Sequence, residues 1–418
     1  MAGKCKTVRK GFDYHRCDDF AAYLNHMARQ GWHFKQWRTG LVFEQGKPEN
    51  SVYCVEVFSG GSEYDTRPEP QTEEFAEYCE AAGWKMIDAR RKFVVFKRVR
   101  EDAVPIMTDE ERFENISRAE SPDIWRTFAL PLAWCGMKVF EFCSSFEFRI
   151  FSNVDLFFML FWAALLLLAV LHCAEFLLWK FRCRRRIHEE KPLFFGRGRQ
   201  NFSGKWYSIL RNSLLFAALG FFLLMGQSVT VLILLAIAAA MWLMGYLIAR
   251  FRPDADTNAA IQVLFSGVLI FFLLASTPFL GQTGNLGFYD VMEPPLTYAD
   301  MGIDLELTEI RYSRVQESFF GNKRYANLDY GDEYLFYSIY HTEYDWVMDK
   351  LWEEETQGKA NEAREYCTDA WDALEAYRNG AGAYLVRYED DLWIISLSLE
   401  EPLTQDQIDA VIAVLAEG

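Results

Sequence analysis

The chain has 418 residues, of which 51% are hydrophobic and 24% charged, and its formal net charge is −16. This composition excludes a disordered protein, because disorder requires few apolar residues and a high charge density. The nine cysteines include no Cys-x-x-Cys pair, which excludes a zinc knuckle and a thioredoxin-like redox motif.

The charge is divided unevenly along the chain. Residues 1–123 carry 19 basic and 22 acidic groups, residues 124–280 carry 15 and 8, and residues 281–418 carry 9 and 29. A basic, apolar middle between two soluble ends is typical of a membrane protein. We therefore predict an α+β soluble N-terminal domain, a helical transmembrane bundle and an α+β C-terminal domain.

Residues 1–100 contain an internal repeat. The segment YLNHMARQGWHF, from Tyr23 to Phe34, aligns with FAEYCEAAGWKM, from Phe75 to Met86. Each copy reads as strand, helix, strand, strand, which predicts a doubled β-α-β-β domain. The two copies share a Gly–Trp motif, which comprises Gly31, Trp32, Gly83 and Trp84. We interpret this motif as structural, because a glycine after each helix can adopt the left-handed cap conformation. Residues 101–123 read as a linker.

Five segments between residues 124 and 280 are candidates for membrane spans of about 20 residues. They are residues 124–143, 154–179, 207–226, 228–249 and 259–280. The first segment is polar for a span, with Arg126, Pro131 and Glu141, and its alternative interpretation is an amphipathic helix in the membrane interface.

Basic clusters predict the orientation of these spans. Arginine and lysine follow Trp179 and Ala249, so these two ends are expected in the cytoplasm. The first ten residues lack the apolar run of a signal peptide, so we expect the N-terminal domain in the cytoplasm as well. A cytoplasmic N-terminal domain and a cytoplasmic end at Trp179 are compatible only if residues 124–143 also cross the membrane. We predict a multi-pass cell-membrane protein with its N-terminus cytoplasmic and its C-terminus extracytoplasmic.

Two ionisable residues interrupt the second span. His172 and Glu175 are three residues apart, hence on one helical face near the basic end. Ionisable groups inside a membrane are often functional. Because both lie close to the basic edge, the favoured interpretation is structural: Glu175 pairs with Arg182 or another nearby base, and His172 bonds to a neighbouring helix. The alternative is a proton relay or ion site.

Residues 281–418 read as an acidic α+β domain. We predict a strand over 334–340, helices over 344–355 and 361–377, a hairpin from 384–388 and 392–398, and a last helix after Thr404. The acidic charge argues against a nucleic-acid partner.

Motifs for chemistry are not found. The sequence has no P-loop, no His-Glu-x-x-His pair and no Gly-x-Ser-x-Gly elbow, and the acidic turn around Asp329 is more typical of a solvated loop than of a calcium site. We expect no catalytic residue, no cofactor and no metal.

The doubled helix–Gly–Trp–strand pattern followed by several spans resembles the bacterial multi-pass membrane family built on domain of unknown function 2812. The resemblance is clearest over residues 4–100. It implies a signalling role, because genes of that family commonly lie beside PadR-like transcription regulators, and it implies no catalytic residues.

These observations favour a non-enzymatic sensor or regulatory accessory that couples the two soluble domains. The alternative is a small ion-coupled transporter using His172 and Glu175, and an enzyme without a known motif is a third possibility. The expected partners are the lipid bilayer, the regulon of a PadR-like regulator or another membrane protein, and a second copy of the chain, with no direct contact to nucleic acid.

Overall fold

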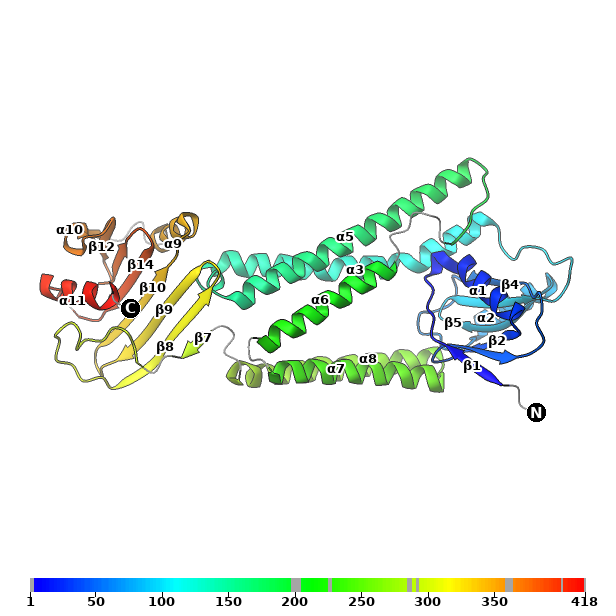
Figure 1. Cartoon of the computed structure of the whole chain (residues 1–418), viewed down its shortest axis with the longest axis horizontal. Coiled ribbons are helices and arrows are strands. Elements are labelled where there is room, and N and C mark those ends of the chain that lie inside the picture. The colour runs from blue at the N-terminus through cyan, green and yellow to red at the C-terminus, as the bar shows by residue number, and fades with distance from the viewer. Residues whose placement is uncertain are drawn as a thin grey trace. The chain divides into compact units, whose positions relative to one another are not determined.

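The structure is a computed structural model that describes residues 4–196, 204–224, 228–283, 288–290, 293–357, 364–399 and 401–416 (Figure 1). The chain forms two compact units. The first comprises residues 1–133 and 163–280, and the second comprises residues 134–162 and 281–418.

The N-terminal domain contains the same element order twice, which confirms the predicted repeat. The first copy consists of β1 (Cys5–Val8), the 3₁₀ helix η1 (Tyr14–Arg16), α1 (Cys17–Arg29), β2 (Trp32–Trp37) and β3 (Leu41–Gln45). The second consists of β4 (Tyr53–Val57), α2 (Pro70–Ala81), β5 (Trp84–Arg90) and β6 (Phe93–Arg98). Each copy forms its own antiparallel three-stranded sheet, in the orders β1-β3-β2 and β4-β6-β5.

Helix α1 lies at the centre of this domain, in contact with both β2 and β4. Its apolar face packs into a cluster that we call the domain core, which also includes residues from both sheets and from two long helices that follow. Members of the domain core include Phe20, Leu24, Phe43, Val55, Phe93, Phe113, Ile116 and Cys183. Helix α2 instead covers the other face of the second sheet, where a smaller cluster contains Ala76, Cys79, Val94 and Phe96.

Six helices follow. They are α3 (Asp109–Ser144), α4 (Phe146–Arg149), α5 (Asn153–His188), α6 (Gly204–Leu224), α7 (Ser228–Phe251) and α8 (Ala255–Thr283). Helix α3 begins inside the segment that the sequence reads as a linker, because Phe113 and Ile116 of its first turns are buried in the domain core.

Two of these helices, among the described residues, are long and apolar enough to cross a membrane. They are Asn153–His188 and Val231–Phe251, while Ser208–Leu224 is apolar but shorter. The predicted bundle of five packed spans is not supported by this test. Only 11% and 6% of the two apolar windows are buried in the protein, so these two helices present apolar side chains outward.

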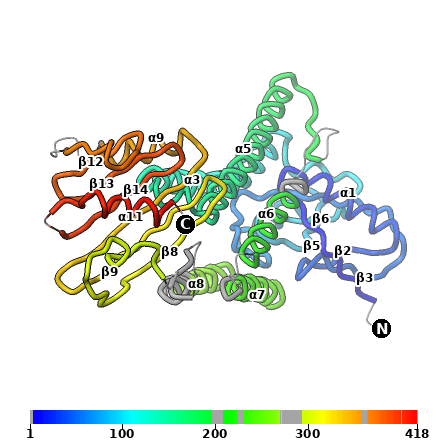
Figure 2. The backbone as a smooth tube through the Cα atoms, turned by 60° about the vertical axis from the view of Figure 1, so that its left-hand side comes forward, coloured from blue at the N-terminus to red at the C-terminus, as the bar shows by residue number. Residues whose placement is uncertain are grey.

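The second unit is built on an eight-stranded sheet in the order β11-β12-β13-β14-β10-β9-β8-β7, which confirms a C-terminal sheet domain. Figure 2 shows β12, β13 and β14 beside one another. The strands are β7 (Phe288–Asp290), β8 (Glu309–Ser318), β9 (Gly321–Asp329), β10 (Tyr334–His341), β11 (Arg364–Tyr366), β12 (Glu375–Asn379), β13 (Tyr384–Arg387) and β14 (Asp391–Leu397). The helices are α9 (Asp345–Gln357), α10 (Thr368–Trp371) and α11 (Gln405–Ala416).

The two faces of this sheet bury different clusters. One face packs against α11 through Ile408 and Val411. The other packs against α9 and against the turn between α3 and α5, in a cluster that we call the turn core. Members of the turn core include Phe142, Phe146, Ile150, Phe151, Leu156, Tyr340, Val347 and Leu392.

The predicted helix over residues 361–377 is wrong for its described part. Residues 361–363 lie outside the described residues, and the rest forms β11, α10 and β12. The φ angle of Asp372 is 47°, in the left-handed region, and it ends α10 after one turn. Arg364–Tyr366 then pairs with Tyr377–Asn379, because the edge of the sheet supplies hydrogen bonds that outweigh the helical spacing.

Candidate functional site

The two ionisable residues that the sequence singles out lie on α5. His172 and Glu175 are half-buried, and both line a cavity of about 750 Å³ in the first unit. The cavity also receives side chains from the loop before α1, from β2, from the β5–β6 turn and from α3. These include Asp13, His15, Trp37, Arg90, Phe93, Glu120 and Asp123.

A hydrogen-bonded pair closes one side of this cavity. Glu120 accepts hydrogen bonds from the backbone N–H of His15 (2.9 Å) and from its Nδ1, which lies 2.7 Å from Oε1 and 3.0 Å from Oε2. Burial lowers the pKa of His15, but the charge and the hydrogen bond of Glu120 outweigh burial, and the pKa is raised above its ordinary value of 6.5. The pair fixes the loop before α1 to α3.

Aromatic rings form the apolar wall of the cavity. The ring centroids of Trp37 and Phe93 are 5.9 Å apart, and Trp179 lies 5.7 Å from Phe176 and 5.9 Å from His15. Such rings give a large and rigid apolar surface. Together with the polar pair, they make the cavity suitable for a small molecule that has an apolar body and a polar end.

Charges of both signs surround the cavity. Glu175 lies within electrostatic reach of His15 and Arg182. On another side, the guanidinium of Arg90 lies 5.8 Å from the centre of the Trp37 ring, and burial lowers the pKa of Arg90 to about 10. Carboxylates and imidazoles in one cavity can bind a polar ligand or exchange protons. Within the described part of the chain, no group of three or more His, Cys, Asp or Glu side chains could hold a metal ion.

The family comparison covers part of these walls. Residues 16–129 match the model of a family described as protein of unknown function DUF2812. The match covers this segment of the chain, which we call the DUF2812 domain. The segment contains both helices of the repeat and the first part of α3, including Glu120. Searches of curated proteins and of solved structures find no match to the chain.

The Gly–Trp motif of the DUF2812 domain lies outside the cavity. Gly31 and Gly83 follow α1 and α2 with φ angles of +80° and +94°, which a glycine adopts without strain. Trp32 begins β2 and packs against the domain core, while Trp84 begins β5 and donates a hydrogen bond from Nε1 to the Val104 carbonyl at 2.7 Å. These four residues have structural roles and do not line the cavity.

Sequence reasoning missed the partners of His172 and Glu175. His15 and Glu120 are separated by 105 residues, and no local pattern connects them. One signal is present in α3, where Phe113, Ile116, Glu120 and Ile124 recur at helical spacing and all four are buried. A single carboxylate in an otherwise apolar stripe indicates a buried polar partner.

The DUF2812 domain also holds the turn between α7 and α8. Arg252 donates from Nη2 to Asp88 Oδ1 (2.8 Å) and from Nε to the Thr66 carbonyl (2.6 Å). Asn258 donates to the Tyr64 carbonyl at 2.6 Å. The domain is therefore attached to the helices at two places, through the domain core and through this turn.

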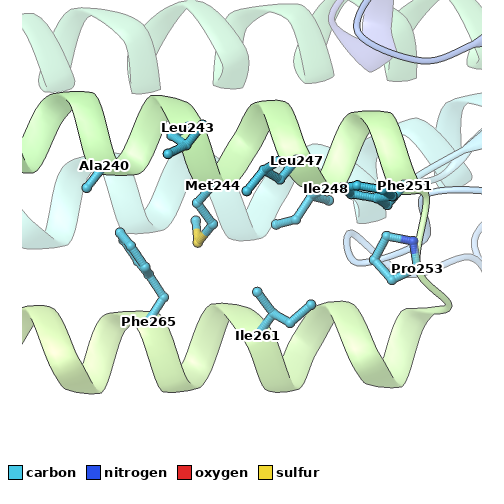
Figure 3. A pocket seen from close by; sticks show the side chains of 9 residues that line it. All are labelled: Ala240, Leu243, Met244, Leu247, Ile248, Phe251, Pro253, Ile261 and Phe265. Atoms are coloured by element: carbon cyan, nitrogen blue, oxygen red, sulfur yellow. The ribbon is translucent and has the colours of Figure 1, made fainter.

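A second cavity, of about 400 Å³, lies between α7 and α8 and is lined only by apolar side chains (Figure 3). Met244 of α7 and Ile261 and Phe265 of α8 point toward one another across it. A ligand site usually needs a few polar groups to orient its ligand. The mixed cavity around His15 and Glu120 is therefore the stronger candidate.

Proposed function

We propose that this DUF2812-domain protein is a multi-pass membrane sensor or regulatory accessory, in which α3 and α5 carry a change from the C-terminal domain to the DUF2812 domain. One observation carries the proposal. Both helices are continuous over 36 residues, and each contributes to the domain core near one end and to the turn core near the other. A packed helix transmits displacement because side-chain packing is discrete and stiff.

Contacts along α3 and α5 support crossing by both helices. Phe113 and Trp179 are 5.7 Å apart, and Trp134 stacks on Trp162 at 5.2 Å. If α5 crosses the membrane, α3 crosses beside it in the opposite direction. The pair of Lys138 and Glu141, 2.7 Å apart, lowers the cost of the charges in residues 124–143.

The contacts of the DUF2812 domain support one orientation for the remaining helices. The domain binds the start of α3, the end of α5 and the α7–α8 turn, so these three places belong on one side of the membrane. The basic clusters in residues 180–186 and 250–252 favour the cytoplasm for that side. The chain then crosses with α3, α5, α6, α7 and α8, and the acidic C-terminal domain is extracytoplasmic.

A buried ion-pair network supports the proposal that the DUF2812 domain responds to movement of α3. Arg112 of α3 donates to Asp18 (2.6 Å) and to Glu56 (2.9 Å), and its guanidinium lies 4.9 Å from the Phe195 ring. Asp18 belongs to the first copy of the repeat and Glu56 to the second. A movement of α3 therefore acts on both copies at once.

In this proposal the protein is not an enzyme, and its output is a change in a partner. The partner is a PadR-like regulator's regulon or another membrane protein, and a homo-oligomer is compatible with the outward-facing apolar helices. No direct contact with nucleic acid is proposed, because the chain carries a net charge of −16.

The first test is topology. Reporter fusions after Arg118, Asp155 and Gly418 should report from the cytoplasm, the exterior and the exterior, respectively. A cytoplasmic report from Gly418 would exclude the C-terminal domain as a receiver of external signals.

The coupling itself is tested by hydrogen exchange on the full chain in lipid nanodiscs. Lys323→Met removes a buried ammonium that lies 3.2 Å from Glu147 in the turn between α3 and α5. It should change exchange in α3 near Phe113 and in the loop around His15. The matched control is Lys350→Met, which alters an exposed lysine on α9. A response limited to the C-terminal domain would contradict the proposal.

A second candidate function rests on His172 and Glu175, which share their cavity with His15 and Glu120. An ion-coupled transporter could pass a proton among these groups. It predicts proton-linked flux in liposomes that is lost in Glu175→Gln, and equal flux in variant and wild type would exclude it. We favour the sensor because the cavity is lined largely by the DUF2812 domain and by the basic end of α5.

A further inference from the structure

A groove separate from the candidate cavity lies between the start of α3 and the end of α5. Its volume is about 520 Å³. Its charged and hydroxyl-bearing lining residues include Glu110, Glu114, Ser117, Arg118, Lys180 and Arg184. Nothing in the proposed sensor mechanism uses these side chains.

The lining residues follow a fixed order along α3. Ser121, Ser117, Glu114 and Glu110 recur every three or four residues and therefore share one face. Ser121 is nearest to the apolar part of the helix, and Glu110 is farthest from it. Lys180 and Arg184 form a matching stripe on α5, directly after its apolar segment.

One hydroxyl in the groove has no hydrogen-bond partner. Ser117 is 8% exposed, and within the described residues its Oγ has no hydrogen-bond partner. Ser121, by contrast, donates to the Ser117 carbonyl at 2.6 Å. A buried hydroxyl without a partner is unfavourable, so a ligand atom bound in the groove would complete its hydrogen bonding.

The charged side chains of the groove also suit a bound ligand. In the part of the chain that the structure describes, none of its five charged side chains has an ion-pair partner within 4.0 Å. Three are basic and two are acidic. A ligand that carries both a phosphate and an ammonium group would match both signs, whereas a simple anion would leave Glu110 and Glu114 facing negative charge.

We propose that this groove binds the headgroup of an aminophospholipid, with its phosphate held by Arg118, Lys180 and the Ser117 hydroxyl, and its primary ammonium held by Glu110 and Glu114. This inference rests on the proposed membrane insertion with these helix ends in the cytoplasm. The order along α3 then matches the lipid, whose phosphate lies nearer the bilayer than its amine. Basic pockets at cytoplasmic helix ends are common headgroup sites.

The amine distinguishes this site from general attraction to lipid. A primary ammonium donates three hydrogen bonds, whereas the quaternary ammonium of phosphatidylcholine donates none. Phosphatidylglycerol supplies a phosphate without an amine. The site should therefore prefer phosphatidylethanolamine over both.

Native mass spectrometry of the full chain, released from nanodiscs that contain all three lipids in equal amounts, measures this preference. Retained phosphatidylethanolamine should exceed the other two by about tenfold, the effect of one charged hydrogen bond. Glu110→Gln combined with Glu114→Gln should abolish the preference while phosphatidylglycerol is still retained. Arg118→Gln should weaken retention of both lipids.

Two further variants separate binding from folding. Ser117→Ala should reduce lipid retention without lowering the stability of the protein, because among the described residues Oγ has no hydrogen-bond partner to lose. Arg185→Gln is the control, since this exposed neighbour on α5 pairs with Glu189 at 2.8 Å instead of lining the groove.

Several results would overturn the inference. Equal retention of the choline and ethanolamine lipids would exclude the amine contact, and a preference for phosphatidylglycerol would assign a plain anion site. Displacement of the lipid by inorganic phosphate at equal concentration would assign a free anion. If the chain inserts but shows no preference, only this inference fails; if it does not insert, the proposed function fails too.

Discussion

The two copies of the DUF2812 repeat have the same elements but different surroundings. Helix α1 is buried on several sides, and Phe20, Leu24 and Ala28 have no exposed surface. Helix α2 is partly exposed, with Tyr78 71% accessible, and buries only a narrow face against its own sheet. Duplication therefore supplied two similar units, and packing against α3 and α5 gave the first copy a central position.

The copies also differ in their connections to the long helices. The first copy contacts α3 through Asp18 and through His15, which precedes α1. The second copy contacts α3 through Glu56 and the α7–α8 turn through Asp88. A perturbation of α3 should therefore affect both copies, while a perturbation within α2 should remain local.

The largest effect is expected where α3 joins the two copies. Arg112→Ala leaves Asp18 and Glu56 without their shared base, and we expect a loss of about 3–5 kcal/mol in the free energy of unfolding. Pulse proteolysis of the full chain in nanodiscs measures this loss. Arg29→Ala, at an exposed position of α1, should change stability by less than about 0.5 kcal/mol.

The same variant has a predictable pH dependence. Burial raises the pKa of Glu56, and the charge of Arg112 opposes that rise. Without Arg112, the pKa rises further. A carboxyl whose pKa is raised in the folded state stabilises the fold at low pH, and this contribution is lost as the pH rises through the folded pKa. The deficit of Arg112→Ala should therefore grow from pH 4 to pH 7, and a deficit independent of pH would contradict the assignment.

A matched pair of substitutions compares the two helices directly. Phe20→Ala removes a fully buried ring that lies 4.5 Å from Phe12, 5.3 Å from Trp37 and 5.7 Å from Phe93, and should cost about 3–5 kcal/mol. Phe75→Ala, in the half-buried face of α2, should cost about 1–2 kcal/mol. Urea denaturation followed by proteolysis gives both values. Equal losses would mean that α2 is as central as α1.

The repeat was predictable because its signals are local. Helical spacing and a glycine after each helix are read within a dozen residues, and both copies form as predicted. The C-terminal domain was harder, because residues 364–377 have helical spacing while their final structure depends on pairing with other strands. Strands β8 and β9 were missed for the same reason.

The residues of the candidate site also differ in whether the local sequence could predict them. His172 and Glu175 were noticeable because they interrupt an apolar helix. His15 and Glu120 were not, since their importance comes from a contact between segments 105 residues apart. A sequence lists the groups that are costly to bury, but the fold decides which of them meet.

The cap glycines should show a smaller difference between the copies. An alanine at either position must adopt a positive φ, which costs about 1 kcal/mol. At Gly31 the new Cβ would also lie 2.8 Å from the Gly46 backbone oxygen, whereas at Gly83 it would lie 2.9 Å from the Ala103 side chain in a loop. We expect about 2–3 kcal/mol for Gly31→Ala and about 1–2 kcal/mol for Gly83→Ala, measured by the same proteolysis. The reverse order would place the more rigid cap in the second copy.

The smallest expected effect concerns His15, in the 3₁₀ helix before α1. Burial lowers the pKa of His15, but the charge and the hydrogen bond of Glu120 outweigh burial, so the pKa is raised in the folded state. Its contribution to stability is therefore complete below the ordinary pKa of 6.5 and is lost as the pH rises through the folded value. His15→Gln should lower stability by about 1 kcal/mol at pH 5.5 and by less at pH 8.5.

The control for this change is His26→Gln, at an exposed position of α1, where the imidazole lies 3.0 Å from the Gln30 amide. It should have no comparable pH-dependent effect. If His15→Gln also loosens α3 near Glu120 in hydrogen exchange, the loop before α1 is a second link between the first copy and the long helices. If exchange in α3 is unchanged, Arg112 alone carries that link, and the first copy owes its central position to the domain core.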